Sequence, residues 1–207
     1  MTARHLAFLV EEPSMEAFLR ALLPRMLPAG CTFEIHPFQG KSDLLAKLQA
    51  RLRGYSVWLP NDWRIVVIVD RDNDDCRKLK RHLERKVESS GLGTRSSVRS
   101  AQWKVVTRIA IEELEAWYFG DWSAVQTAYP RVPTNIPKKA RFRNPDAINA
   151  TWEAFERILQ RHGYFENGLR KMEAARELGR HIDPNRNKSS SFLKLREAII
   201  EATAYLA

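Results

Sequence analysis

The alternation of apolar and amphipathic segments is the clearest pattern in the first 120 residues. Apolar runs suited to strands occupy residues 5–10, 32–38, 64–70 and 103–109. Stretches with apolar residues at helical spacing fall at residues 15–26, 42–53, 72–90 and 112–119. Because strands and helices alternate, the pattern predicts an α/β fold with a mostly parallel central sheet flanked by helices.

The strand at residues 64–70 carries the strongest signal. Its sequence, RIVVIVD, is a run of β-branched residues that ends in Asp70. Such a run is typical of a buried central strand, and the carboxyl ends of parallel strands share the edge where ligands bind. Glu11 follows the first predicted strand, and Asp72 lies just beyond Asp70. We therefore expect Glu11, Asp70 and Asp72 to converge at one edge of the sheet.

The character of the chain changes near residue 129. Prolines and a basic cluster fall within residues 129–145, in a segment without hydrophobic periodicity. The cluster consists of Lys138, Lys139, Arg141 and Arg143. Beyond it, helices are predicted at residues 145–162, 168–180 and 191–206. We predict an α/β domain over residues 1–128, followed by a basic linker and a helical C-terminal extension, residues 129–207, packed on it.

Charge adds a candidate partner to this picture. The chain has 34 Lys and Arg residues against 25 Asp and Glu residues, a net charge of +9. Such an excess attracts polyanions by long-range steering and by release of counterions. Nucleic acid is therefore a candidate partner, although many basic proteins bind none.

Two further features exclude other classes. Cys31 and Cys76 lie far apart, without the spacing of a zinc site or a disulfide framework, so we expect reduced thiols in a cytoplasmic protein. No apolar run approaches the roughly 20 residues that span a bilayer. The N-terminus enters a strand pattern at once, which is not typical of a signal peptide. We therefore expect no association with a membrane.

Clustered carboxylates at the sheet edge indicate a metal site. They raise one another's pKa unless a cation neutralises them, and Mg²⁺ or Mn²⁺ prefers oxygen ligands that a substrate phosphate can complete. Each acid also has a structural alternative. Glu11 could be a solvated loop residue, and Asp70 or Asp72 could cap the next helix, although Asp74 and Asp75 are better placed as caps.

A second acidic group stands at the next strand-to-helix junction. It contains Glu112, Glu113 and Glu115, and Glu112 and Glu115 share a helix face because they are three residues apart. Glu112 and Glu115 could supply a second metal site or orient the first. The alternative is compensation of the helix dipole in the first turn.

The acidic residues resemble the toprim pattern of topoisomerases, primases and overcoming-lysogenization-defect nucleases. In that pattern a glutamate follows the first strand and an Asp-x-Asp follows a later one, positions matched here by Glu11, Asp70 and Asp72. Toprim proteins often have glycine after the glutamate, whereas this chain has Glu12, which could alter the loop or add a ligand. The resemblance implies a toprim-like fold with Mg²⁺ held by these three acids.

Longer motifs resemble the domain of unknown function 4276 family, which is toprim-like and often encoded beside ATPases. The motifs are Gly40-Lys41-Ser42, Asp70-Arg71-Asp72-Asn73-Asp74-Asp75-Cys76, Ile111-Glu112-Glu113-Leu114-Glu115-Ala116-Trp117 and Asn187-Lys188-Ser189-Ser190-Ser191-Phe192. The resemblance covers nearly the whole chain and implies an ATPase as a protein partner.

Basic residues supply candidates for binding nucleic acid. The candidates are Lys41, Arg95, Arg99, Lys138, Lys139, Arg141, Arg143 and Lys188. Lys41 lacks the spacing of a phosphate-binding loop and could equally be a solvated lysine. Overcoming-lysogenization-defect nucleases use a lysine outside the acidic motifs, and this resemblance makes Lys171 or Lys188 a candidate for stabilising transition-state charge.

Two functions compete on this evidence. The first is a metal-dependent nuclease or phosphoesterase that acts on nucleic acid, in the context of bacterial anti-phage defence with an ATPase partner. Its catalytic residues would be Glu11, Asp70, Asp72 and Lys171. The second is a non-catalytic regulatory or partner-binding subunit of an ATPase complex. A tyrosine-dependent topoisomerase is disfavoured because no tyrosine lies in a recognisable second catalytic domain.

Overall fold

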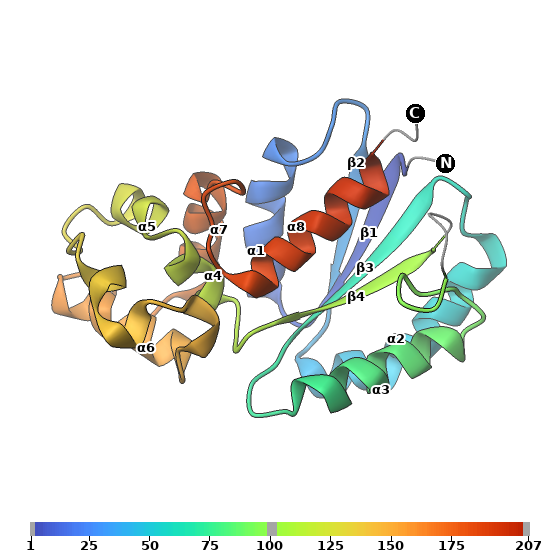
Figure 1. Ribbon diagram of the computed structural model, residues 1–207, viewed down its shortest axis with the longest axis horizontal. Coiled ribbons are helices and arrows are strands. Elements are labelled where there is room, and N and C mark those ends of the chain that lie inside the picture. The colour runs from blue at the N-terminus through green and yellow to red at the C-terminus, as the bar shows by residue number, and fades with distance from the viewer. Residues whose placement is uncertain (1–2, 99–102, 205–207) are drawn as a thin grey trace.

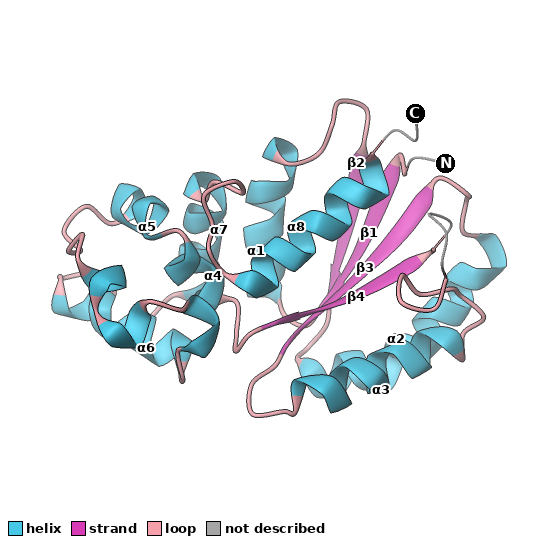
Figure 2. Ribbon diagram, in the orientation of Figure 1, coloured by secondary structure: helices cyan, strands magenta, loops and turns pink. Residues whose placement is uncertain are grey.

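The computed structural model describes residues 3–98 and 103–204 and is built around a parallel sheet. Its strands are β1 (His5–Val10), β2 (Thr32–Pro37), β3 (Trp63–Asp70) and β4 (Val105–Ala110), in the order β2-β1-β3-β4. Every strand pair in this sheet is parallel. The predicted α/β class is therefore confirmed, and Figure 2 shows the strands enclosed by helices.

Helices cover both faces of the sheet. The face that carries Leu9 and Val67 packs against the leucines of α2 (Lys41–Trp58) and α3 (Cys76–Glu88). The other face, with Phe8 and Val66, packs against α1 (Pro13–Leu22) and α8 (Ser190–Thr203). Figure 1 shows α2 and α3 on one side and α1 and α8 on the other. This double cover explains why β3 is apolar at consecutive positions instead of alternating with polar residues.

The C-terminal half adds short helices that join the same core. They are α4 (Glu115–Gly120), α5 (Trp122–Ala128), α6 (Thr151–Arg161) and α7 (Lys171–His181), with the 3₁₀ turns η2 (Ile136–Lys138), η3 (Ala140–Phe142) and η4 (Pro145–Ala147). One further 3₁₀ turn, η1 (Leu23–Arg25), follows α1. Side chains of α6, α7 and α8 belong to one apolar cluster with those of β1 and α1. The helical extension predicted for the C-terminus is present, and one continuous core crosses residue 128.

Helix starts differ from the predicted ones where proline or a better cap is available. α1 begins at Pro13 and not at the predicted Met15, because proline at the first helical position needs no backbone hydrogen bond. α3 begins at Cys76 and is capped by Asp75, whose carboxylate accepts from the Lys78 backbone N–H at 2.7 Å. The alternative in which Asp70 or Asp72 caps this helix is therefore wrong.

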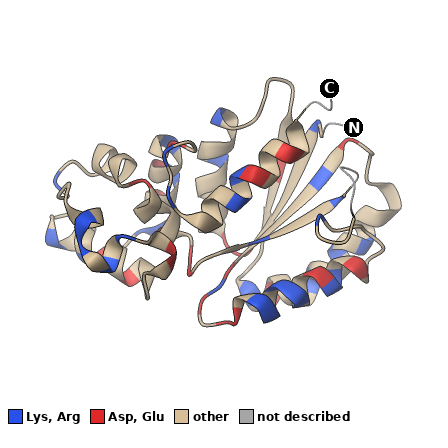
Figure 3. Ribbon diagram, viewed as in Figure 1, with Lys and Arg blue, Asp and Glu red and all other residues tan. Residues whose placement is uncertain are grey.

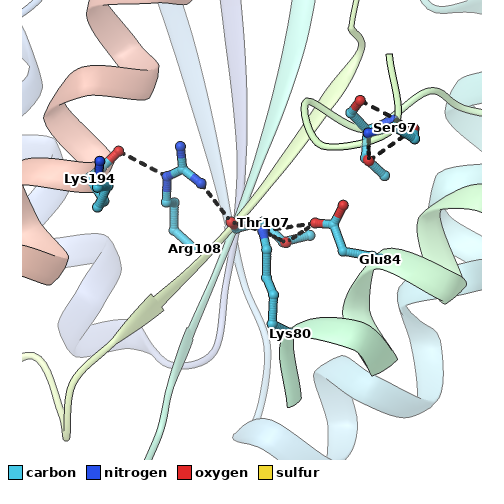
Figure 4. A network of polar contacts seen from close by, with 7 residues as sticks. Lys80, Glu84, Ser97, Thr107, Arg108 and Lys194 are labelled. Atoms are coloured by element: carbon cyan, nitrogen blue, oxygen red, sulfur yellow. Dashed lines mark hydrogen bonds and ion pairs between the residues drawn. The ribbon is translucent and has the colours of Figure 1, made fainter. Parts of the chain in front are cut away.

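The outer edge of the sheet is protected by charged side chains. β4 is an edge strand, and the Thr107 carbonyl accepts from Lys80 Nζ at 2.8 Å and from Arg108 at 3.1 Å. Figure 4 shows Lys80 and Glu84 converging on Thr107 from α3, while Arg108 reaches across to Lys194 of α8. Charged groups on an edge strand disfavour pairing with another chain. Among the described residues, no helix combines the length and the apolar character needed to cross a bilayer.

Candidate active site

Glu11 and Asp70 meet where two neighbouring strands end. β1 and β3 are adjacent, and Glu11 Oε2 accepts a hydrogen bond from the Asp70 backbone N–H at 2.9 Å. β1 leads to α1 on one face of the sheet and β3 leads to α3 on the other, so a topological switch point lies between β1 and β3. Ligands of open α/β sheets bind at the carboxyl ends of the strands beside such a point. The structure thus brings together Glu11 and Asp70, as the sequence predicts.

Asp70 is a buried carboxyl with unused hydrogen-bonding capacity. Its relative exposure is 8%, and its Oδ1 has no hydrogen-bond partner among the residues that the structure describes. Burial raises the pKa of Asp70 well above its ordinary value, and the nearby carboxylates of Glu11 and Glu115 raise it further. The pKa of Glu11 is also raised, chiefly by burial. A buried carboxylate of this kind requires either a proton or a cation.

Glu115 and Lys171 complete the cluster from the helical part of the chain. Glu115 opens α4, is only 4% exposed, and burial raises its pKa to about 7 against the opposing charge of Lys171. Burial lowers the pKa of Lys171, but the carboxylates of Glu115 and Glu12 outweigh that effect and raise it overall. Lys171, the predicted catalytic lysine, is therefore near enough to the acidic group to interact with it electrostatically.

Asp72 is held by Lys41, the first residue of α2. Its backbone is left-handed, with φ at 47°, and its carboxylate accepts from Lys41 Nζ at 2.7 Å. The same ammonium donates to Asp74 at 2.9 Å and to the Arg71 carbonyl at 3.1 Å. Lys41 thus fastens the loop after β3, and the Asp72 side chain remains 45% exposed. Binding of phosphate by Lys41 stays a prediction.

The other two acids of the Glu112–Glu115 segment anchor a distant helix. Glu112 pairs with Arg71 at 2.7 Å and accepts from the Ala150 backbone N–H at 2.8 Å. Glu113 accepts from the Thr151 hydroxyl at 2.7 Å and from the Trp152 backbone N–H at 3.0 Å. Acidic groups at a helix N-terminus compensate the helix dipole. Here Glu112 and Glu113 do so for α6, and not for α4, the helix that follows them in the sequence. Metal binding by Glu112 stays a prediction.

The carboxylates fit a hard divalent cation in their chemistry. Within residues 3–98 and 103–204, no three Asp, Glu, His or Cys side chains are already gathered as a ligand set. Glu11 and Glu115 nevertheless both act electrostatically on the buried Asp70 carboxylate, and within the described ranges Asp70 Oδ1 lacks the partner that a cation would supply. Asp72 and Glu112 are instead engaged by Lys41 and Arg71.

The basic residues predicted to bind nucleic acid fall into two groups. Arg95 pairs with Glu197 at 2.9 Å and with Glu201, which fastens its loop to α8. Arg99 lies outside the described residues. The exposed candidates, free of ion pairs within the described part of the chain, are Lys138, Lys139, Arg141, Arg143 and Lys188. Figure 3 shows acidic segments in the loops that leave β3 and β4, and basic segments on and around α6.

Sequence reasoning missed two arginines beside the basic cluster. Arg157 and Arg161 of α6 line a pocket of about 320 Å³ together with Lys139 and Arg141. Their spacing of four residues places both on one face of a helix, and this signal was available in the sequence. It carries little weight alone, because exposed helices often bear charges at that spacing.

The fold and site define a class: a doubly covered parallel α/β protein with buried carboxylates at its switch point. Residues 10–200 match the family described as "Domain of unknown function (DUF4276)". The chain belongs to that family, as its longer motifs predict. No curated protein matches it, and no solved structure matches it.

Proposed function

We propose that this protein is a Mg²⁺-dependent, toprim-type nuclease or phosphoesterase that hydrolyses phosphodiesters of nucleic acid. The observation that carries the proposal is the buried Asp70 carboxylate at the switch point, one oxygen of which has no partner in the described part of the chain and on which Glu11 and Glu115 act electrostatically. The resemblance of Glu11, Asp70 and Asp72 to the toprim pattern supports the same chemistry. The net charge of +9 supports a polyanionic substrate.

Each residue then has a distinct part in the reaction. Glu11, Asp70 and Glu115 would hold the cation, and Mg²⁺ or Mn²⁺ would activate water and offset phosphoryl charge when bound. Lys171, half-buried beside these carboxylates, places a fixed positive charge where the phosphodiester gains negative charge. Lys41 keeps Asp72 in place by fastening the loop after β3.

The test compares the purified Asp70→Asn and Glu11→Gln variants with the wild type. Single- and double-stranded DNA and RNA are incubated with Mg²⁺ or Mn²⁺, and cleavage is followed on gels. We expect each variant to lose at least about 100-fold in rate, because charge is removed at the metal site while the side-chain volume is kept. Glu88→Gln, an exposed substitution on α3, is the matched control. Wild-type cleavage by both variants would refute the assignment.

A second function is favoured by one exposed apolar feature. Val57 and Trp58, at the end of α2, are 85% and 55% exposed, and they lie beside the start of β3, at the sheet edge opposite to the acidic group. Adjacent exposed apolar side chains are typical of protein interfaces. They support the alternative of a non-catalytic, partner-binding subunit of an ATPase complex in anti-phage defence. A stable complex with an ATPase, without cleavage of any polynucleotide, would favour this alternative.

A further inference from the structure

The pocket between α6 and the η2–η3 turns has a rim made of cations. Lys139 and Arg141 border it from the turns, and Arg157 and Arg161 border it from α6. All four side chains are exposed, and none takes part in an ion pair within the described ranges. None of the described residues that line the pocket is acidic. Four uncompensated cations around one cavity attract an anion of more than a single charge.

The floor of the pocket is apolar. It is formed by Ile136 and Ile158, both nearly fully buried, and by Phe142. The Phe142 ring stacks on Phe119 of α4, with 5.3 Å between centroids and 6° between planes. The Arg141 guanidinium lies over the Phe142 ring, 5.4 Å from its centroid, so a flat group on the floor would meet the ring and this guanidinium together. A cavity of about 320 Å³ with such a floor is at the lower end of the size range of ligand pockets.

The position of α6 links this pocket to the carboxylate cluster. α6 begins at Thr151, on the carboxylate of Glu113, two residues before Glu115. At about 1.5 Å per helical residue, Arg157 and Arg161 stand roughly 9 and 15 Å along the helix from that start. A stacked strand rises about 3.4 Å per phosphate along the helix axis and an unstacked strand is longer per phosphate, so this distance corresponds to at most about four phosphates.

We propose that this pocket binds an unpaired nucleotide of single-stranded nucleic acid, a few positions from the phosphodiester that is cut. The phosphates contact the rim arginines and lysines, and the base lies on the floor beside Phe142. A base inside a duplex is stacked and paired and cannot reach such a floor without being extruded. The assignment rests on the proposed function and adds to it a preference for single strands.

Binding is measured without cleavage, by fluorescence anisotropy in EDTA. We expect the Arg157→Gln/Arg161→Gln double variant to bind a labelled single-stranded oligonucleotide at least about 10-fold more weakly than the wild type. Its plot of log K against log salt concentration should be less steep by about 1.4, since each phosphate contact on a single strand contributes roughly 0.7. The matched control is Arg53→Gln/Arg85→Gln, which removes two exposed arginines from α2 and α3. Equal binding by the two double variants would overturn the proposal.

The floor is tested on the wild type with altered ligands. An abasic oligonucleotide has the same length and charge but no bases, so we expect weaker binding than for the intact strand, and a duplex should also bind more weakly. Equal affinity for all three ligands would overturn the assignment of a base to the floor. The binding assay also separates this proposal from the nuclease proposal. If binding of the oligonucleotide depends on Arg157 and Arg161 but the protein cuts no polynucleotide, the nuclease proposal is refuted and the nucleotide-binding pocket is supported.

Discussion

The carboxylates of Glu115 and Asp70 connect stability to pH because both are buried. A glutamate that titrates at about 7 in the folded protein, and near 4.5 when unfolded, binds more protons in the folded state between these two values. The contribution of this group to the free energy of unfolding is therefore fully present below the pKa of the unfolded state. It is lost as the pH rises through the pKa of the folded state. Asp70 acts in the same direction.

Replacement of Glu115 by glutamine should make this pH dependence weaker. For metal-free wild type, we expect Glu115 to reduce the free energy of unfolding by up to about 3 kcal/mol between pH 4.5 and 7, at roughly 1.4 kcal/mol per pKa unit. Urea denaturation at a series of pH values measures the difference between wild type and Glu115→Gln. Adding Mg²⁺ at pH 7 should stabilise the wild type more than the variant. Parallel pH profiles would contradict the buried, titrating glutamate.

At the scale of elements, α6 depends on acids that lie far from it in sequence. Glu113 accepts hydrogen bonds from Thr151 and Trp152, 38 and 39 residues later. The sequence places Glu113 at a strand-to-helix junction, where its own helix is the obvious partner. Only the folded chain shows that it serves the helix that carries Arg157 and Arg161. Elements can thus be predicted from local periodicity, but contacts between distant elements cannot.

Removing this anchor should loosen the start of α6. Glu113→Ala eliminates both accepted hydrogen bonds and the favourable charge at the helix N-terminus, so we expect a loss of about 1–2 kcal/mol in stability. Glu113→Gln keeps an acceptor oxygen and should lose less. Hydrogen exchange at the amides of Trp152 and its neighbours reports the change locally. Unchanged exchange in the alanine variant would show that α6 is held by its apolar face alone.

At the same scale, the sequence predicts the strands better than the helix starts. The predicted bounds of β1 and β3 agree with the observed bounds to within one residue, because a buried parallel strand is a continuous apolar run. α5 is not predicted at all, and α4 begins at Glu115 instead of near Glu112. Short helices have little periodicity, and their positions depend on tertiary contacts such as the Arg186–Asp121 ion pair, which spans 65 residues.

For the whole molecule, the site is assembled from both predicted regions. Glu11 and Asp70 come from strands, whereas Glu115 and Lys171 come from α4 and α7. The acidic pair could be predicted because strand order brings adjacent carboxyl ends together. The approach of Lys171 could not be derived in this way, because it requires α7 to pack closely on α1. That packing depends on Gly179, where an added Cβ would lie 2.5 Å from the Phe18 carbonyl oxygen.

Two helical glycines therefore have opposite expected responses to alanine. At Gly54 in α2 nothing lies within 4 Å of an added Cβ, so Gly54→Ala should stabilise the protein by about 0.5–1 kcal/mol. Gly179→Ala should instead cost about 1–3 kcal/mol through overpacking against Phe18 and Ala21. Because α7 also carries Lys171, Gly179→Ala should slow cleavage while Gly54→Ala leaves it unchanged. Thermal denaturation and nuclease assays on both variants measure these effects. Stabilisation by Gly179→Ala would mean that α7 does not dock closely on α1, and Lys171 would then lose its place beside Glu115.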